Sequence, residues 1–530
     1  MNLIAIRSSE NSTAGTCDTV PRRFDRVVAL NPPSPPNSGA NRESMGGYGQ
    51  LYPVGPPAPV LDFAYLVSYL SDRSIPLDVI EAQGLDLDTA QVAARVASLA
   101  ALHADERILI VARVALCCLD WDLSVCTAIK HAVPSASITV YGSVLNDVVK
   151  RVQREACLDY IVQGEPDETI CDLVEGRPEG EVAGLSWRQQ DRWISNPERP
   201  LMKELDRLPF PKWELLPYHR YTMPKSSATS PVPYLPMLTS RGCPFGCHYC
   251  PYPISQGAPF RYRSPANVVD EIEHLSRDLG IQYIIFRDPM FSLRQDRVVS
   301  ICDEIRRRGL AIRWRCETRV DCLSEATLRA MAAAGCEGIN FGIESADVEI
   351  QAKAGRKPIK QARIIETVAL CRQLGIRTFG FFIVGLPGDT VHTVLESIRF
   401  AIGLRPTWVQ FNAASPMMGT PLRAWALSNG LATDEEYSYR TCHEATMGNE
   451  NLTKDQVAAL QKFAVFFERY LMNRGGVFKD EARKDWPYRL AHRTADSVAL
   501  LVARTVHAIG TTYFVHAYAL AAPAKVRAAD

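Results

Sequence analysis

Three cysteines within eight residues are the part of this chain most suited to chemistry. Cys243, Cys247 and Cys250 have the spacing C-x-x-x-C-x-x-C, in a chain with 15 cysteines among 530 residues. Thiolates gathered this densely indicate a metal site. Three thiolates do not close a tetrahedral zinc site, and no fourth cysteine or paired histidine follows at finger spacing. They suit an iron–sulfur cluster with one iron open to an outside ligand. Two alternatives remain: His248 as a further ligand, and a buried group of structural cysteines.

Composition excludes several classes of protein. Lys and Arg number 59 and Asp and Glu number 59, so the basic excess expected of a nucleic-acid-binding protein is missing. With 47% hydrophobic and 22% charged residues the chain is typical of globular proteins rather than disordered ones. An odd number of cysteines without a secretory signal predicts a reducing, cytoplasmic setting. The apolar stretch Val498–Ala522 contains Arg504, His507 and His516, so we expect a packed helix there and no transmembrane segment.

The elements that must position the cysteines fall into two alternating series. After a tail at residues 1–25, residues 26–175 predict five strands, each separated from the next by helices, which is typical of a doubly wound α/β domain. The expected strands are Arg26–Asn31, Leu77–Glu81, Ile108–Ala112, Ser137–Tyr141 and Tyr160–Gln163. The expected helices are Leu61–Ser71, Thr89–Leu102, Leu119–His131 and Val144–Glu155. Ligands of such a domain lie beyond the carboxyl ends of its strands.

The second series follows a Pro- and Trp-rich segment, residues 176–233, expected to be a linker. Residues 234–421 predict six βα units, a partial TIM-like (β/α)6 barrel. The expected strands are Met237–Ser240, Tyr283–Arg287, Ile312–Glu317, Gly338–Ile343, Thr378–Val384 and Trp408–Asn412. The expected helices are Ala266–Leu279, Gln295–Arg308, Glu325–Ala334, Lys360–Leu374 and Val391–Leu404. The cysteines follow the first strand, and residues 422–530 predict a helical domain that caps the substrate.

The cysteine loop, with Tyr249 before its last cysteine, resembles the signature of radical SAM enzymes. Four later segments resemble the family's motifs in the same order: Phe286–Phe291, Glu317–Asp321, Gly342–Ser345 and Phe382–Thr390. The exit Asn412–Pro421 also agrees. The resemblance implies a 4Fe-4S cluster on the three cysteines and bound S-adenosyl-L-methionine (SAM). It implies SAM contacts from Tyr249, Asp288, Glu317, Arg319, Glu344, Ser345, Gly385 and Leu386.

The first domain is similar to the cobalamin-binding domain of cobalamin-dependent radical SAM proteins. This resemblance lies in the turn after the first strand and in the segment Tyr160–Thr169. It implies cobalamin contacts from Asn31, Pro32, Pro33, Gly142, Ser143, Gly164 and Glu165. The D-x-H-x-x-G motif that ligates cobalt in other cobalamin domains is missing, and we expect His103 and His131 to be surface residues.

Together the resemblances imply a methyltransferase. It would transfer a methyl group from methylcobalamin to an unactivated carbon of a small molecule, such as a secondary metabolite, with electrons from a flavodoxin- or ferredoxin-type donor. One alternative uses the same cofactors without methyl transfer, as the anaerobic ring cyclase of bacteriochlorophyll synthesis does. Another is a cobalamin-binding sensor with no catalytic activity. Substrate and catalytic residues beyond the cofactors are not indicated by the sequence.

Overall fold

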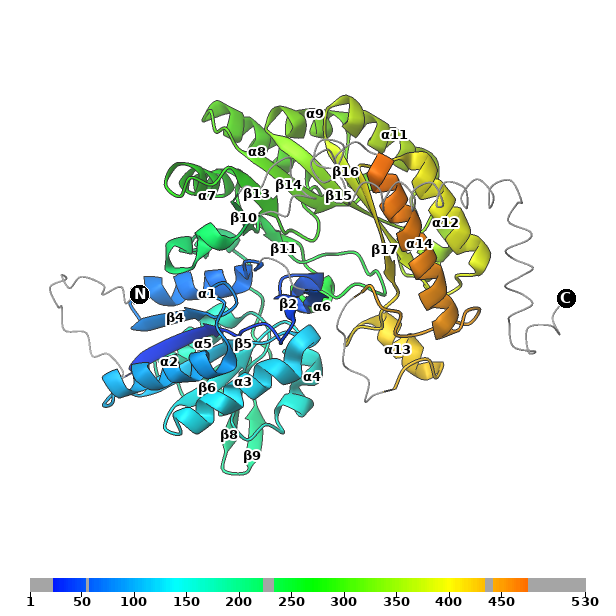
Figure 1. Cartoon of the computed structure of the whole chain (residues 1–530). Coiled ribbons are helices and arrows are strands. Elements are labelled where there is room, and N and C mark those ends of the chain that lie inside the picture. The colour runs from blue at the N-terminus through cyan, green and yellow to red at the C-terminus, as the bar shows by residue number, and fades with distance from the viewer. Residues whose placement is uncertain (1–21, 54–56, 223–232, 434–441, 475–530) are drawn as a thin grey trace, which may run out of the picture.

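The computed structural model describes residues 22–53, 57–222, 233–433 and 442–474. Two α/β units follow one another along the chain, and helices α13 (Pro421–Ser428) and α14 (Lys454–Arg474) complete the described part (Figure 1). Both the tail and the apolar stretch Val498–Ala522 fall outside these ranges, apart from residues 22–25 of the tail. No helix in the described ranges is both long and apolar enough to cross a membrane.

The first unit is built on a seven-stranded sheet with the order β4-β1-β5-β6-β7-β8-β9. Its parallel strands are β1 (Arg26–Asn31), β4 (Leu77–Glu81), β5 (Ile108–Arg113), β6 (Ser137–Tyr141) and β7 (Tyr160–Val162), which confirms the five predicted strands to within a residue. They are apolar because helices bury both faces of the sheet. The first strand lies between the second and the third, so the order reverses between β1 and β5, and ligands bind at such a reversal.

Helices cover this sheet on both sides. Apolar side chains of α1 (Leu61–Asp72) and α5 (Pro166–Val174) pack with Val27 and Leu109 on one face. Those of α2 (Thr89–Leu102), α3 (Leu119–Ala132) and α4 (Leu145–Val152) pack with Val28 and Ile110 on the other. The four predicted helices are confirmed, and α5 was not predicted.

Two hairpins in this region differ from the sequence prediction. β2 (Ser38–Asn41) pairs with β3 (Gln50–Pro53) just after β1. β8 (Leu185–Gln189) and β9 (Arg192–Ser195) extend the first sheet next to β7, although residues 176–233 were expected to be a linker. The turn between β8 and β9 is Gln190-Asp191, which lacks the Asn-Gly or Asp-Gly signal of a tight hairpin. Gln190 takes the left-handed conformation there, at φ +56°, although it is not a glycine.

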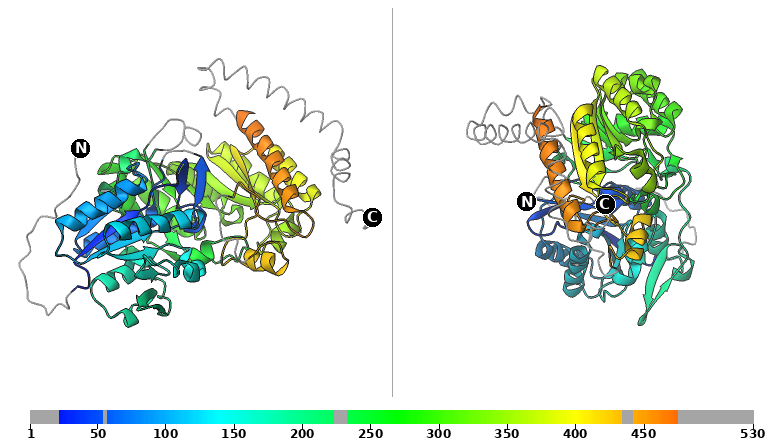
Figure 2. Two further views of the ribbon diagram at one scale, coloured as in Figure 1. Left: turned by 60° about the horizontal axis from the view of Figure 1, so that its bottom comes forward. Right: turned by 90° about the vertical axis from the view of Figure 1, so that its right-hand side faces the viewer.

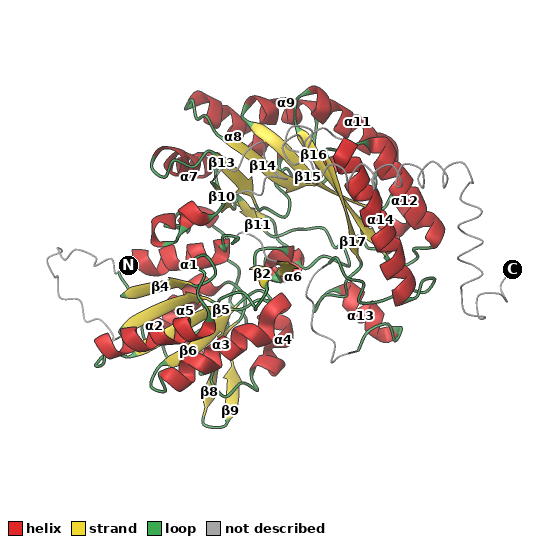
Figure 3. Ribbon diagram, viewed as in Figure 1, coloured by secondary structure: helices red, strands yellow, loops and turns green. Residues whose placement is uncertain are grey.

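The second unit is a six-stranded parallel sheet with the order β10-β13-β14-β15-β16-β17. Its strands are β10 (Tyr234–Met237), β13 (Tyr283–Phe286), β14 (Arg313–Thr318), β15 (Cys336–Glu344), β16 (Arg377–Val384) and β17 (Trp408–Ala413). Helices α7 (Pro265–Arg277), α8 (Gln295–Arg307), α9 (Glu325–Ala333), α11 (Gln361–Gln373) and α12 (Val391–Leu404) cover its outer side (Figures 1 and 3). This confirms the six predicted strands and the five predicted helices between them. The first strand begins three residues earlier than predicted, and Pro236 is tolerated within it because β10 is an edge strand.

Smaller elements surround the cysteine loop and the open edge. β11 (Ser240–Arg241) pairs with β12 (Arg261–Tyr262), and the cysteine loop with α6 (Tyr252–Ser255) lies between them. A short helix, α10 (Val348–Lys353), follows β15. α14 runs beside α12 and along the edge strand β17, where Gln461 Nε2 donates to the carbonyl oxygen of Phe411 at 3.1 Å (Figure 2). The predicted C-terminal helical region is therefore represented by α13 and α14 in the described part.

Candidate active site at the domain interface

The cysteine loop is compact. Gly242, at φ +86°, precedes it, and a side chain there would collide with the carbonyl oxygen of Pro259. The N–H of Cys243 donates to Gly257 O and the N–H of Cys250 donates to Cys247 O, both at 3.1 Å. Burial raises the pKa of the Cys243 and Cys250 thiols, and the Cys247 sulfur raises it further in both. The three sulfurs thus lie within electrostatic range of one another.

The surroundings of this loop fit a negatively charged iron–sulfur cluster. The Arg319 guanidinium lies 4.6 Å from the ring centroid of Phe245 inside the loop, and its Nη1 is buried without a hydrogen-bond partner. In the described chain no group of three or more His, Cys, Asp or Glu side chains could hold a single metal ion. A cluster does not require that convergence, because each thiolate binds a different iron. The His248 side chain packs against Gly355, and the backbone N–H of His248 donates to the carbonyl oxygen of Ala354 at 2.9 Å.

Glu344 and Arg356 form a buried ion pair beside the loop. Glu344 ends β15 with φ +68°, next to an irregularity in the pairing with β16. Arg356 Nη1 lies 3.4 Å from Glu344 Oε1 and 3.2 Å from the Tyr249 hydroxyl oxygen. Burial raises the pKa of Glu344, although Arg356 opposes the shift. Arg356 was not found from the sequence, because an arginine after a short helix carries no local signal.

Three other predicted SAM residues contact the protein's own groups, at two different places. Glu317 lies on the inner face of the barrel, where its Oε1 accepts from Arg287 at 2.9 Å and from Asn340 at 3.3 Å. Asp288 and Ser345 are buried in hydrogen-bond networks of the protein itself. Asp288 accepts from the N–H of Thr239 and from the hydroxyls of Thr239 and Ser240, and Ser345 Oγ accepts from the N–H of Asp347.

The loop after β16 is held by its own acid. The N–H groups of Gly385 and Leu386 both donate to Asp389 Oδ2, at 3.0 and 3.1 Å. Leu386 packs in the same apolar cluster as Tyr249 and as Leu422 of α13. Of the eight predicted residues, the structure therefore gathers four side chains at the cysteine loop: Tyr249, Arg319, Glu344 and Leu386.

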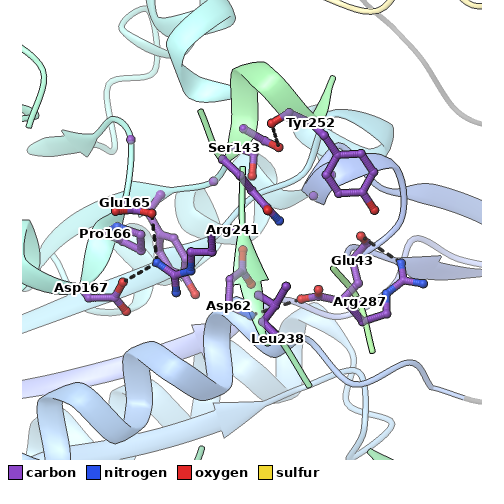
Figure 4. A pocket seen from close by; sticks show the side chains of 17 residues that line it. Glu43, Asp62, Ser143, Glu165, Pro166, Asp167, Leu238, Arg241, Tyr252 and Arg287 are labelled. Atoms are coloured by element: carbon purple, nitrogen blue, oxygen red, sulfur yellow. Dashed lines mark hydrogen bonds and ion pairs between the residues drawn. The ribbon is translucent and has the colours of Figure 1, made fainter. Parts of the chain in front are cut away.

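A cavity lies between the two units, where the carboxyl ends of the first sheet meet the segment around the cysteines (Figure 4). The cavity is partly open to solvent, and the space between its walls is about 740 Å³ when the open solvent at its mouth is included. Gly142, Ser143, Gly164 and Glu165, which follow β6 and β7 and are predicted to contact cobalamin, line it. From the second unit it is lined by Arg241, Arg287 and α6 residues including Tyr252.

The turn after β1 does not line this cavity. Asn31 Nδ2 donates to Glu81, and the carbonyl oxygen of Pro33 accepts from Arg42 and from Trp121. Asn31, Pro32 and Pro33 are buried. Residues from the β2–β3 loop, Glu43, Gly46 and Gly47, line the cavity instead. Sequence reasoning missed this loop because its short strands show no periodicity.

Four carboxylates face this cavity, and their environments differ. Burial and the neighbouring Asp62 raise the pKa of Glu43 to about 7, and burial raises the pKa of Asp167 to about 6. Burial would also raise the pKa of Glu165, but Arg241 and Arg261 outweigh it, so that pKa is lowered. Glu165 Oε1 lies 3.1 Å from Arg241 Nη1 and 2.8 Å from Arg261 Nη1.

This lining fits a large ligand rich in amide groups, such as a corrin. Gly164 has φ +78°, and a side chain added there would meet no atom within 4 Å. The Oδ1 atoms of Asp62 and Asp167 are buried without hydrogen-bond partners. Unpaired buried acceptors are costly unless a donor reaches them, and the amide N–H groups around a corrin ring are such donors. The described lining contains no histidine; His103 lies at the end of α2, where its Nδ1 contacts Glu106 Oε1 at 3.0 Å.

Asp167 makes the stability of the unliganded protein depend on pH. Burial raises the pKa of Asp167 from its ordinary 3.8 to about 6 in the folded protein, so its stabilising contribution is present below about pH 4 and is lost as pH rises through about 6. We expect Asp167→Asn to remove this loss, worth up to about 3 kcal/mol. Urea unfolding at pH 4, 5, 6 and 7 measures it, with the exposed Asp191→Asn as the control. A constant difference between Asp167→Asn and the parent across these pH values would contradict the expectation.

Comparison with known proteins agrees with this site. Residues 237–401 match the model of the radical SAM superfamily. An uncharacterized methyltransferase of Pyrococcus horikoshii is 32% identical over 312 residues, 58% of this chain and 66% of the relative. An anaerobic magnesium-protoporphyrin IX monomethyl ester cyclase of Cereibacter sphaeroides is 28% identical over 307 residues, 55% of this chain and 48% of the relative. The matches thus span about half to just under two thirds of these relatives.

Solved structures show the same fold. The radical SAM methyltransferase TsrM of Kitasatospora setae, with cobalamin and a [4Fe-4S] cluster bound, superposes with a TM-score of 0.60 at 19% identity, over 77% of this chain and 75% of TsrM. The cobalamin-dependent enzyme OxsB superposes with a TM-score of 0.65 at 17% identity, over 84% of this chain and 67% of OxsB. Residues 237–401 are therefore a radical SAM domain, which implies a [4Fe-4S] cluster and SAM as cofactors, and the chain has the overall fold of the cobalamin-dependent enzymes TsrM and OxsB.

Proposed function

We propose that the protein is a cobalamin-dependent radical SAM methyltransferase that methylates an unactivated carbon of a small molecule. The observation that carries the proposal is the cavity, which is lined from one side by the carboxyl ends of the first sheet and from the other by residues flanking the cysteine loop. A methyl carrier must lie close to the carbon that receives the methyl group. A cavity shared by the two units supplies that proximity.

The chain's own residues have distinct roles in this proposal. Cys243, Cys247 and Cys250 hold the cluster, and Tyr249, Arg319, Glu344 and Arg356 surround it with charged and polar groups that suit the ammonium and carboxylate of SAM. Gly142, Ser143 and Gly164 let a large ring approach the backbone. The cluster with SAM supplies radical chemistry and cobalamin supplies the methyl group, while the protein orients them and excludes water. A flavodoxin- or ferredoxin-type partner would supply the electrons.

A cyclase without methyl transfer is the second candidate. Three relatives are anaerobic magnesium-protoporphyrin IX monomethyl ester cyclases, and the one from Synechocystis matches over 77% of this chain at 24% identity. The fold and the proposed cofactors are compatible with both reactions.

Isotope transfer separates the two. The anaerobically reconstituted protein would be incubated with SAM bearing a trideuterated methyl group, cobalamin, a reductant and metabolite extracts. We expect a product that carries the intact CD₃ group, detected by mass spectrometry, and no such product without cobalamin. A new product without deuterium would support the cyclase. SAM turnover with no cobalamin retained by the protein would refute both cobalamin-dependent functions.

A further inference from the structure

The inner face of the second sheet carries four arginines, of which Arg287 has been described above and Arg313, Arg315 and Arg377 have not. Helices cover the outer face, so residues alternate along each strand between the helices and the interior of the barrel. Arg313, Arg315 and Glu317 of β14 share the inner face. In the parallel register Arg315 lies beside Ile285 of β13 and Gly338 of β15.

Three of these four arginines have an acidic partner. Near the amino ends of the strands, Glu337 pairs with Arg313 at 3.3 Å and with Arg377 at 2.7 Å. Nearer the carboxyl ends, Glu317 pairs with Arg287 at 2.9 Å. Arg315 lies between these two levels. Throughout the described chain its guanidinium forms no ion pair or hydrogen bond, and its Nε is buried without a partner.

Arg315 is surrounded by aromatic side chains and a glycine. Its guanidinium lies 5.9 Å from the ring centroid of Phe379, and the neighbouring strand has a glycine, Gly338, where a side chain would crowd that ring. Tyr234 and Tyr283 lie within electrostatic range, and within the described residues neither hydroxyl forms a hydrogen bond. Burial lowers the pKa of Arg315. Arg315 is half-buried and its Nε is fully buried, yet among the described residues no carboxylate pairs with it, so this cation lacks the anion that would compensate it.

We propose that Arg315, with Tyr234 and Tyr283, forms a subsite inside the barrel for an anionic group of the substrate, a carboxylate or a phosphoryl group. The guanidinium presents a planar set of donors that matches either group, and the two hydroxyls add further donors. The identity of the occupant as substrate rests on the proposed function. Arg315 lies four residues before Arg319, about 13 Å along an extended strand. The subsite therefore selects a molecule long enough to reach from mid-barrel toward the cysteine loop.

Anion binding and stability test the subsite without knowledge of the substrate. Thermal unfolding of the reconstituted full chain would be followed in sodium phosphate, sodium acetate and sodium chloride at equal ionic strength. We expect phosphate, acetate or both to raise the melting temperature above that in chloride. Protection by phosphate alone would identify a phosphoryl substrate, and protection by acetate alone a carboxylate.

Arg315→Met and Arg315→Lys are the decisive variants, and Arg313→Met is the matched control on the same strand face. Arg315→Met should weaken the binding of the protecting anion by about tenfold or more. Arg315→Lys should retain part of that binding. In chloride, Arg315→Met should raise the melting temperature by about 2–4 °C because it removes an unpaired, half-buried charge. Arg313→Met, which leaves Glu337 with one partner, should lower the melting temperature.

Two results would overturn the subsite: anion protection that is unchanged in Arg315→Met, or destabilisation of Arg315→Met in chloride similar to that of Arg313→Met. Iron and cobalamin contents measured on the same samples keep the proposals separate. Loss of both cofactors with retained, Arg315-dependent anion protection would refute the proposed function and leave the subsite standing.

Discussion

Replacement of Cys243, Cys247 and Cys250 by alanine together is expected to abolish the iron–sulfur cluster and all SAM-dependent activity. The loop brings the three thiols within electrostatic range, beside Arg319. Without thiolates the loop has no ligands for iron. Iron analysis should fall from about four atoms per chain to about zero, and the brown absorption of the reconstituted protein should disappear.

Cys322→Ala is the sharp control for this result. Its thiol is half-buried and lies within electrostatic range of both Cys243 and Arg319. It follows Arg319-Asp321 in the chain and has no partner at cluster spacing, so we expect Cys322→Ala to keep the full iron content. Iron retained in the triple alanine variant, or lost in Cys322→Ala, would show that the ligand assignment is wrong.

Glu165→Gln is expected to destabilise the protein by about 3–5 kcal/mol, because it removes the buried acid shared by Arg241 and Arg261 and leaves Arg241 only the longer contact to Asp167 at 3.8 Å. Both carboxylate oxygens are in use: Oε1 contacts Arg241 and Arg261, and Oε2 accepts from the N–H of Met202 at 2.8 Å. Arg241 directly precedes the Gly242-Cys243 segment, so this ion pair fastens the cysteine loop to the first unit. Glu165, predicted from sequence to contact cobalamin, also joins the two units. Urea unfolding measures the loss.

Glu168→Gln supplies the matched control three residues further along α5. The Glu168 carboxylate is more exposed than that of Glu165 and lies 3.4 Å from Arg199. Both residues of this pair lie on the first unit's side of the interface. Such pairs contribute about 0–1 kcal/mol. Equal losses from Glu165→Gln and Glu168→Gln would mean that the ion pair with Arg241 and Arg261 does not stabilise the interface.

Much of the fold could be predicted from the sequence because its signals are local. A continuous apolar run such as Ile108–Ala112 identifies a buried parallel strand within a few residues. The bounds of the helices Thr89–Leu102 and Val391–Leu404 follow from the spacing of apolar residues within each helix, and both ranges agree with the structure. The β2–β3 and β8–β9 hairpins were missed because their strands are short and gain their order from pairing rather than from composition.

The proximity of Cys243, Cys247 and Cys250 was determined by the sequence alone, since three thiols within eight residues of one loop must lie near one another in any fold. What joins them to the rest of the site was decided only by the tertiary structure. Glu165 and Arg241 are 76 residues apart, and Tyr249 and Arg356 are 107 apart. Whether Arg315 has a partner depends on which residues the neighbouring strands present to it. Such contacts are set by which strand ends meet, and linear spacing does not encode that.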